Sequence, residues 1–156
     1  MIARVVIQTE DFNVSQVLDQ LRAGDLRVGA ICSFVGTVRD TRMLSGNAAD
    51  QILSLELEHY PGMTEKALLE IETLAIKRWH LDDVYIVHRY GKLNVGEPIV
   101  GIVVFAKHRK EAFESCHFII DFLKTDAPFW KKEITSQKSY WVDAKTIDDD
   151  EKKKWN

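Results

Sequence analysis

The chain alternates between short segments with a two-residue hydrophobic period and longer segments with a helical period. The two-residue period predicts strands, because successive side chains of a strand point to opposite faces. In 52–60, for example, Leu53, Leu55, Leu57 and His59 fall on one face. The predicted strands are Ile2–Gln8, a buried Val28–Val38, Ile52–Tyr60, Val84–Val87, Ile99–Phe105, Phe129–Thr135 and Tyr140–Ala144.

Three segments have the helical period. A short helix begins at a cap on Asn13 or Ser15 and ends near Ala23, before Gly24. A longer helix follows the Pro61-Gly62 break, with an apolar face of Ala67, Leu68, Ile71, Leu74, Ala75 and Trp79. A third spans Lys110–Lys124, and Pro128 prevents it from continuing.

The connecting segments have turn chemistry or high polarity. Thr41–Asp50 has no apolar period and is predicted to be a mobile surface loop. Gly91–Gly96 has a glycine at each end and suits a hairpin-like turn. The polar tail, about residues 147–156, places Asp148, Asp149 and Asp150 each four residues before a lysine, which favours a solvated helical end.

Strands and helices are mixed along the chain, and hairpins outnumber clean strand–helix–strand crossovers. This order predicts an α+β fold rather than a parallel α/β sheet. The 156 residues are enough for one domain with a hydrophobic core, so residues 1–156 are expected to form a single domain.

Composition narrows the function classes. The net charge of -3 excludes a strongly basic nucleic-acid-binding surface. No apolar run approaches the ~20 residues that span a bilayer, and no signal peptide precedes the first strand, so we expect a cytoplasmic protein without membrane contact. Cys32 and Cys116 lie in apolar stretches without a CxxC spacing, which favours buried thiols over a disulfide or a metal pair.

Lys124 is the first candidate for chemistry. It follows Phe113, His117 and Ile120 at helical spacing, which predicts that it lies on the apolar side of its helix. A lysine there either extends its ammonium group to solvent at the helix end or is held in a pocket. A cation also suits a helix C-terminus for structural reasons alone.

The segment Pro128–Glu133 is the second candidate. In an extended chain Phe129, Lys131 and Glu133 share one face, and Trp130 and Lys132 share the other. The lysines either protect an edge strand or form an anion site with Lys124 across the proline bend.

Arginine and histidine at predicted strand ends are the third group. Arg39 follows Phe34-Val35-Gly36-Thr37-Val38, where a guanidinium group suits phosphate or carboxylate, unless it simply pairs with Asp40 or another surface acid. His88-Arg89 and His108-Arg109 also end strands. The second pair directly precedes a helix, whose N-terminus favours anions.

No motif in the sequence supplies a nucleophile. There is no phosphate-binding GxxxxGK[ST] loop, no HExxH, no Cys/His metal cluster and no serine or cysteine in a nucleophile elbow. If the protein is an enzyme, the nucleophile must come from a substrate or a partner.

Five motifs in order resemble the large, catalytic subunit of molybdopterin synthase. They are Phe34-x-Gly-x-Val-Arg39, Leu57-Glu-His-Tyr-x-x-Met63, His88-Arg-x-Gly-x-Leu-x-x-Gly96, His108-Arg-x-x-Ala-Phe113 and Leu123-Lys-x-x-x-Pro-x-Trp-Lys-x-Glu133. The resemblance covers about Val28 to Val142, and its last motif is the most specific.

The resemblance implies an α/β-hammerhead fold with mixed and antiparallel sheets and two long helices. It also implies a dimer of large subunits, each binding one small ubiquitin-like subunit that ends in a Gly-Gly thiocarboxylate, so that the whole is a heterotetramer. The thiocarboxylate supplies the missing nucleophile. The substrate is cyclic pyranopterin monophosphate (precursor Z), which receives two sulfur atoms and becomes molybdopterin; no metal or cofactor is expected.

Residue roles follow from the same resemblance. Lys124 and Lys131 are the expected catalytic residues, and both also contact substrate. The other expected substrate contacts are Thr37, Val38, Arg39, His108, Arg109, Lys132 and Glu133, with Glu133 orienting Lys131 or Arg39. Lys145 stands where the family tends to have arginine, which leaves its role open.

Two rival functions remain at this stage. A non-catalytic scaffold for a ubiquitin-like protein would bind the same partner, but it would not need both Lys124 and Lys131. A small phosphate-ester hydrolase would need a metal cluster or an internal nucleophile, and the sequence has neither.

Overall fold

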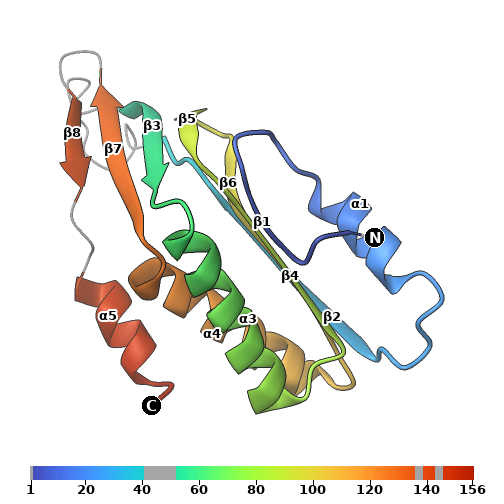
Figure 1. Cartoon of the computed structure of the whole chain (residues 1–156). Coiled ribbons are helices and arrows are strands. Elements are labelled where there is room, and N and C mark those ends of the chain that lie inside the picture. The colour runs from blue at the N-terminus through green and yellow to red at the C-terminus, as the bar shows by residue number, and fades with distance from the viewer. Residues whose placement is uncertain (1, 41–51, 136–138, 143–145) are drawn as a thin grey trace.

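Two four-stranded β-sheets carry the fold in the computed structural model, which describes residues 2–40, 52–135, 139–142 and 146–156 (Figure 1). The first sheet has the order β1 (Val5–Gln8), β4 (Asp83–Arg89), β6 (Pro98–Ala106), β2 (Ala30–Thr37). The second has the order β5 (Gly91–Asn94), β3 (Ile52–His59), β7 (Phe129–Thr135), β8 (Ser139–Val142).

Strand direction differs between the sheets. In the first sheet β1 pairs with β4 in parallel, and the other pairs are antiparallel; the second sheet is antiparallel throughout. Two long helices, α3 (Met63–Trp79) and α4 (Arg109–Asp126), accompany them. The α+β class, with mixed and antiparallel sheets and two long helices, is therefore confirmed.

The core lies on both faces of the first sheet. One face packs against α3 and α4 through a cluster that includes Leu68, Ile86, Ile102 and Ile119. The other face is covered by α1 (Val14–Arg22), which packs against a cluster centred on Phe105 (Figure 1). Because β6 is covered on both faces, Ile99–Phe105 is a continuous apolar run instead of an alternating one.

The start of α1 and its seat on the sheet depend on two residues. Asn13 is the N-cap, with its side chain accepting from Gln16 N at 3.2 Å, which settles the choice between Asn13 and Ser15. Gly101 lets α1 approach, because a Cβ there would lie 2.6 Å from Phe12 and 2.9 Å from Val14.

The structure corrects two predictions about strands. Val28–Val38 was expected to be buried, but β2 is the edge of its sheet and leaves Phe34 and Val35 partly exposed. Gly91–Gly96 was expected to be only a turn. Its first four residues instead form β5 and pair with β3, and the turn lies between Asn94 and Glu97.

Side-chain directions also differ from the periodic pattern. Leu53 is 44% exposed because a register shift between Ile52 and Ser54 rotates the start of β3, so Ser54 and Leu55 are both buried. In α3, Leu74 is 50% exposed, unlike the rest of its predicted face. In α4, Phe113 is 66% exposed, so the stripe Phe113–Lys124 is not the buried side of the helix.

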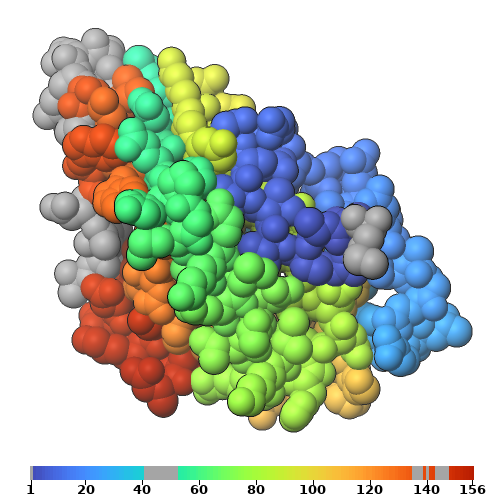
Figure 2. Space-filling model, viewed as in Figure 1, coloured from blue at the N-terminus to red at the C-terminus, as the bar shows by residue number. Residues whose placement is uncertain are grey.

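The C-terminal helix α5 (Thr146–Lys153) confirms a helical tail, but its contacts are not those of a solvated end (Figure 2). Trp155 packs edge-on against Trp79 and Phe118 and donates its indole N–H to Asp121 at 2.7 Å. Lys152 pairs with Asp126 of α4. The tail is thus attached along α4.

Two predictions fall outside the described residues: the loop Thr41–Asp50 and the position of Lys145. The predicted strand Tyr140–Ala144 corresponds to β8, which ends at Val142; residues 143 and 144 also lie outside the described residues. Within the described part of the chain, every helix is too short or too polar to cross a lipid bilayer.

Candidate functional site

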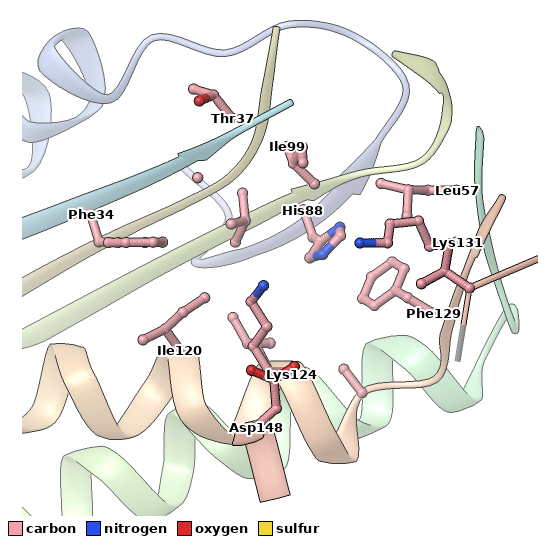
Figure 3. Close-up of a pocket in the computed structure, with 15 residues that line it drawn as sticks. Phe34, Thr37, Leu57, His88, Ile99, Ile120, Lys124, Phe129, Lys131 and Asp148 are labelled. Atoms are coloured by element: carbon pink, nitrogen blue, oxygen red, sulfur yellow. The ribbon is translucent and has the colours of Figure 1, made fainter. Parts of the chain in front are cut away.

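A cavity of about 390 Å³ lies where the two sheets and the end of α4 meet (Figure 3). Its wall is largely apolar, and the polar side chains that enter it come from separate elements. The lining residues are Phe34, Gly36, Thr37, Leu57, His88, Ile99, Val100, Ile120, Leu123, Lys124, Ala127, Phe129, Lys131, Val142 and Asp148.

Lys124 and Lys131 enter this cavity from opposite sides of the Pro128 bend. Lys124 is in the last turn of α4, beside Ile120 and Leu123, and Lys131 is on β7. Their amino groups point into the same space (Figure 3). Asp148 of α5 is the carboxylate among the lining residues, so the two ammonium groups leave the pocket with a positive balance suited to an anion.

Strand alternation correctly separates Lys131 from Lys132. Phe129 and Lys131 both line the cavity, whereas the Lys132 ammonium group lies 5.6 Å from the centre of the Trp141 ring. Lys132 faces Glu56 of β3 and Trp141 of β8 across the sheet. Glu133 is half-buried opposite Leu55 and is not among the residues that line the cavity.

His88, which the sequence offered only as half of a strand-end His-Arg pair and without a role of its own, lines the cavity. Its ring stacks on Phe129 with a centroid distance of 3.6 Å and an interplanar angle of 15°. Burial lowers the pKa of His88 to about 4, with smaller contributions from the nearby Lys124 and His59. The imidazole is therefore neutral at physiological pH.

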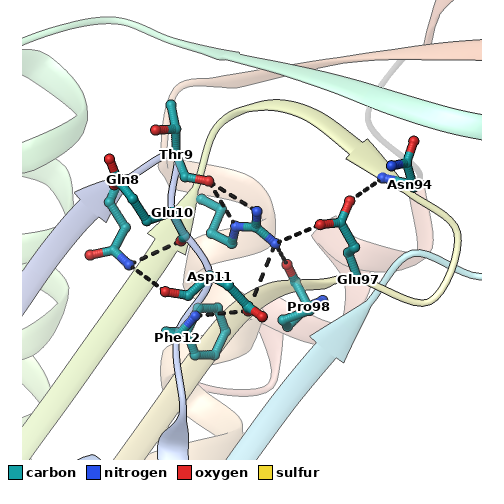
Figure 4. A network of polar contacts seen from close by, with 9 residues as sticks. Gln8, Thr9, Glu10, Asp11, Phe12, Asn94, Glu97 and Pro98 are labelled. Carbon is teal, nitrogen blue, oxygen red and sulfur yellow. Dashed lines mark hydrogen bonds and ion pairs between the residues drawn. The ribbon is translucent and has the colours of Figure 1, made fainter.

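Arg89, the next residue, is not among the residues that line the cavity, and it joins its own strand to the segments of Thr9 and of Glu97–Pro98, which are labelled in Figure 4. Its guanidinium group donates to Thr9 O at 3.0 and 3.1 Å and to Pro98 O at 3.1 Å, and it lies 3.6 Å from a carboxylate oxygen of Glu97. Arg89 is only 6% exposed. It is thus a structural clamp rather than the anion ligand that its strand-end position suggested.

The segment around Arg39 is held by the turn between β5 and β6, which contains Gly96 and Glu97. Val38 is buried, its N–H donates to Glu97 O at 2.9 Å, and its carbonyl accepts from Gly96 N at 2.8 Å. Thr37 lines the cavity, while Arg39 is exposed just beyond the end of β2. The backbone N–H of Val38 is already used inside the protein, so any substrate contact must come from another group of this residue.

His108 and Arg109 lie far from the lysine pair within one chain. His108 is the N-cap of α4, and Arg109 is its first residue; both are exposed. Fifteen residues separate Arg109 from Lys124, which is about 22 Å along the helix axis. The structure does not bring these two residues into the cavity of their own chain.

Among the described residues, the cysteine thiols are not activated as nucleophiles, and the one group of potential metal ligands is already occupied by a lysine. Both cysteines are free, and burial raises the pKa of the Cys116 thiol, with Cys32 as its neighbour. His117, Asp121 and Glu151 do lie close together, with ligand atoms within 4.8 Å of one another. The ammonium group of Lys154 already contacts all three.

Comparison with known proteins is consistent across the whole chain. Residues 7–126 match the family model described as MoaE protein. The chain is 48% identical over 149 residues to the molybdopterin synthase catalytic subunit of Ralstonia nicotianae, covering 96% of this chain and 82% of that protein. It is 47% identical to the protein of the same name from Vibrio cholerae, covering 97% of each.

A solved structure shares both the fold and the sequence. The molybdopterin biosynthesis MoaE protein from Burkholderia ambifaria superposes with a TM-score of 0.80 at 47% identity and covers 99% of both chains. The match extends through both sheets and the helices that build the cavity.

Proposed function

The chain belongs to the MoaE protein family, and from that membership we propose that it is the catalytic subunit of a molybdopterin synthase. It transfers sulfur from the C-terminal thiocarboxylate of a small ubiquitin-like subunit to precursor Z. In each transfer the thiocarboxylate sulfur bonds to a substrate carbon and displaces an oxygen substituent from it, which gives a thioester between partner and substrate. Water then hydrolyses this thioester, so that the bond between sulfur and the acyl carbon breaks, the sulfur stays on the substrate and the partner keeps an ordinary carboxylate. Two transfers form the dithiolene, in the cytoplasm and without a cofactor.

The lysine pair in one pocket is the observation that carries this proposal. A chain terminus that ends in an anionic thiocarboxylate is matched by a largely apolar cavity that also contains cations, and Lys124 and Lys131 supply the cations. The same cations stabilise negative charge that develops as sulfur leaves the acyl carbon. A scaffold that only held the partner would not need two ammonium groups directed at one point.

The missing nucleophile supports the same reading. Burial keeps Cys116 in its thiol form, and Cys32 lies beside it in the core. A thiocarboxylate is already ionised at neutral pH, so it needs no base from this chain to become reactive.

The phosphate end of precursor Z is assigned to Arg39, with Thr37 at the cavity wall. Arg39 is exposed two residues beyond Thr37, which lines the cavity, so its guanidinium group can reach a phosphate in solvent. Lys132, on the opposite face of β7, is a flanking contact at most, and Glu133 acts by orienting its neighbours.

His108 and Arg109 join this site only if a second copy supplies them. β2 is the edge of its sheet, and in the described part of the chain no strand pairs with its outer side. Antiparallel pairing of two β2 edges would bring Ala30 of one copy beside Thr37 of the other. His108 follows Ala106, the partner of Ala30 in β6, so the second copy's α4 N-terminus would then lie beside the Arg39 segment.

The direct test is reconstitution. The purified chain is mixed with precursor Z and the small subunit in its thiocarboxylate form, and dithiolene product is measured. Product should form with the thiocarboxylate and should be absent with a partner that ends in an ordinary carboxylate. Lack of product in the first mixture, or equal product in both, would refute the proposal.

A further inference from the structure

His88 is fixed more firmly than a side chain that merely fills the pocket wall. Its ring lies flat on Phe129, and its Nδ1 is 2.8 Å from the carbonyl oxygen of Arg89. A carbonyl oxygen can only accept, so Nδ1 carries the proton and donates it. Arg89 is itself held by the backbone oxygens of Thr9 and Pro98, so the acceptor that selects this tautomer is rigid.

This tautomer determines what His88 presents to the cavity. With the proton on Nδ1 and the ring neutral, Nε2 has a lone pair and is a hydrogen-bond acceptor. The charged or titratable groups around the ring are Lys124 from α4, Lys131 from β7 and His59 from β3. The amino group of Lys131 points toward the imidazole (Figure 3).

We propose that His88 is a positioning residue: its Nε2 accepts a hydrogen bond from the ammonium group of Lys131 and aims that group at the partner's C-terminal carboxyl carbon. The inference rests on the proposed function, since it assigns a role within the same sulfur transfer. It gives a specific role to His88, which the sequence had offered only as half of a strand-end His-Arg pair.

A neutral acceptor suits this task for an electrostatic reason. Lysine has four rotatable side-chain bonds, and an undirected ammonium group loses part of its effect through misplacement. A carboxylate would direct it too, but would cancel the charge that must attract the anionic tail. The neutral imidazole directs the lysine and leaves its charge intact, and burial in an apolar wall stops the ring from becoming a third, competing cation.

Two substitutions separate positioning from packing. In His88→Gln the side-chain oxygen can occupy the place of Nε2 as an acceptor, but the aromatic stack is lost. In His88→Phe the stack on Phe129 is kept and the acceptor is lost. A packing role predicts that His88→Phe is the better variant, whereas a positioning role predicts that His88→Gln is.

The measurement is kcat with thiocarboxylated partner and precursor Z, alongside thermal unfolding of each variant. His88→Phe should lower kcat by roughly 10- to 100-fold, the cost of a misplaced catalytic group, while unfolding near the wild-type temperature. His88→Gln should retain more activity than His88→Phe despite a lower unfolding temperature. The KM for partner should change less than kcat in both variants.

A double-mutant comparison completes the test. In a Lys131→Ala background, His88→Phe should cause no further loss, because its target is already gone. Equal kcat in His88→Phe and wild type, a reversed ranking of the two variants, or independent losses in the double mutant would each overturn the inference. If the wild-type chain forms no product, the proposed function itself has failed, and that outcome is distinct from all three.

Discussion

Lys131 and Lys132 are adjacent in the sequence and lie on opposite faces of β7. Lys131 lines the cavity together with Lys124, whereas Lys132 lies over Trp141. The two-residue period of an extended chain predicted this separation from the sequence alone. Lys124 was expected at a pocket because it shares a helical stripe with Phe113, but this stripe is not the buried side of the helix, since Phe113 is exposed. The lysine reaches the cavity because α4 ends beside it.

Replacing Lys124 or Lys131, which line the cavity, should reduce product formation more than replacing Lys132, which lies on the opposite face of β7. Lys124→Ala should lower product formation by roughly 10²–10³-fold, the usual cost of removing one preorganised group that stabilises developing charge. Lys131→Ala should be similarly severe, and Lys132→Ala milder. Single-turnover rates with thiocarboxylated partner measure this, with circular dichroism as the control for folding. A larger loss in Lys132→Ala than in Lys131→Ala would contradict the assignment.

His88 should also make the stability of the protein depend on pH. Its pKa is about 4 in the folded protein and 6.5 when exposed, so the unfolded chain binds the extra proton between these values. The folded state is therefore fully favoured above pH 6.5 and loses stability as the pH falls to about 4. The shift corresponds to roughly 3 kcal/mol.

Urea unfolding of wild type and His88→Phe between pH 7 and pH 4 isolates this contribution. The free energy of unfolding should fall more steeply in the wild type, because carboxylates contribute equally to both proteins. Parallel curves would mean that His88 is charged or solvated in the folded state.

Among the helices and strands, the sequence predicts the type of each element better than it predicts which other elements pair with it or pack against it. Ile99–Phe105 was recognisable as a strand, but only the structure explains its unbroken apolar run, with α3 and α4 on one side and α1 on the other. Gly91–Gly96 has the residues of a turn, yet pairing with β3 makes its first half a strand. Long-range pairing of this kind leaves no local periodic signal.

Arg89 shows the same limit for a single side chain. Its position at the end of a strand suggested an anion site, but its partners are the carbonyls of Thr9 and Pro98, and no local pattern predicts that these segments meet Arg89. Removing it should leave two carbonyl oxygens in its buried surroundings without their donor. Arg89→Met is therefore expected to lower the free energy of unfolding by roughly 2–4 kcal/mol.

Chemical denaturation of Arg89→Met and Arg27→Met tests this clamp. Arg27 is exposed and pairs with Asp25, two residues away, so its replacement should change stability little. Comparable small effects in both variants would show that the contacts of Arg89 are not what ties β1 to the β5–β6 turn.

For the molecule as a whole, the sequence predicts a set of candidate site residues but not how they lie relative to one another. Lys124 and Lys131 line the cavity, whereas His108 and Arg109 lie at the far end of α4. The helix length fixes that separation within one chain. The order of the motifs in the sequence carries no information on which copy of the chain supplies each side chain. For this reason the sequence alone predicts a single site for all the candidate residues.

Mixing inactive variants tests whether two copies share the site. Lys124→Ala and Arg109→Ala chains should each be impaired, and co-refolding them should restore roughly one site in four, since mixed dimers keep one complete site. Co-refolding Lys124→Ala with Lys131→Ala should restore none, because both changes affect the same cavity. Failure of the first mixture to regain activity, with mixed dimers present, would confine the site to one chain.

The origin of the transferred sulfur distinguishes delivery by the partner's thiocarboxylate from delivery by a cysteine of this chain. A single turnover is run with ³⁴S-labelled thiocarboxylate on the partner, precursor Z, and either wild type or the Cys32→Ala/Cys116→Ala variant. The label should appear in the dithiolene with both proteins, at similar rates apart from a packing cost to stability. Unlabelled product, or loss of transfer in a well-folded variant without cysteines, would mean that a cysteine of this chain carries the sulfur and would contradict the mechanism.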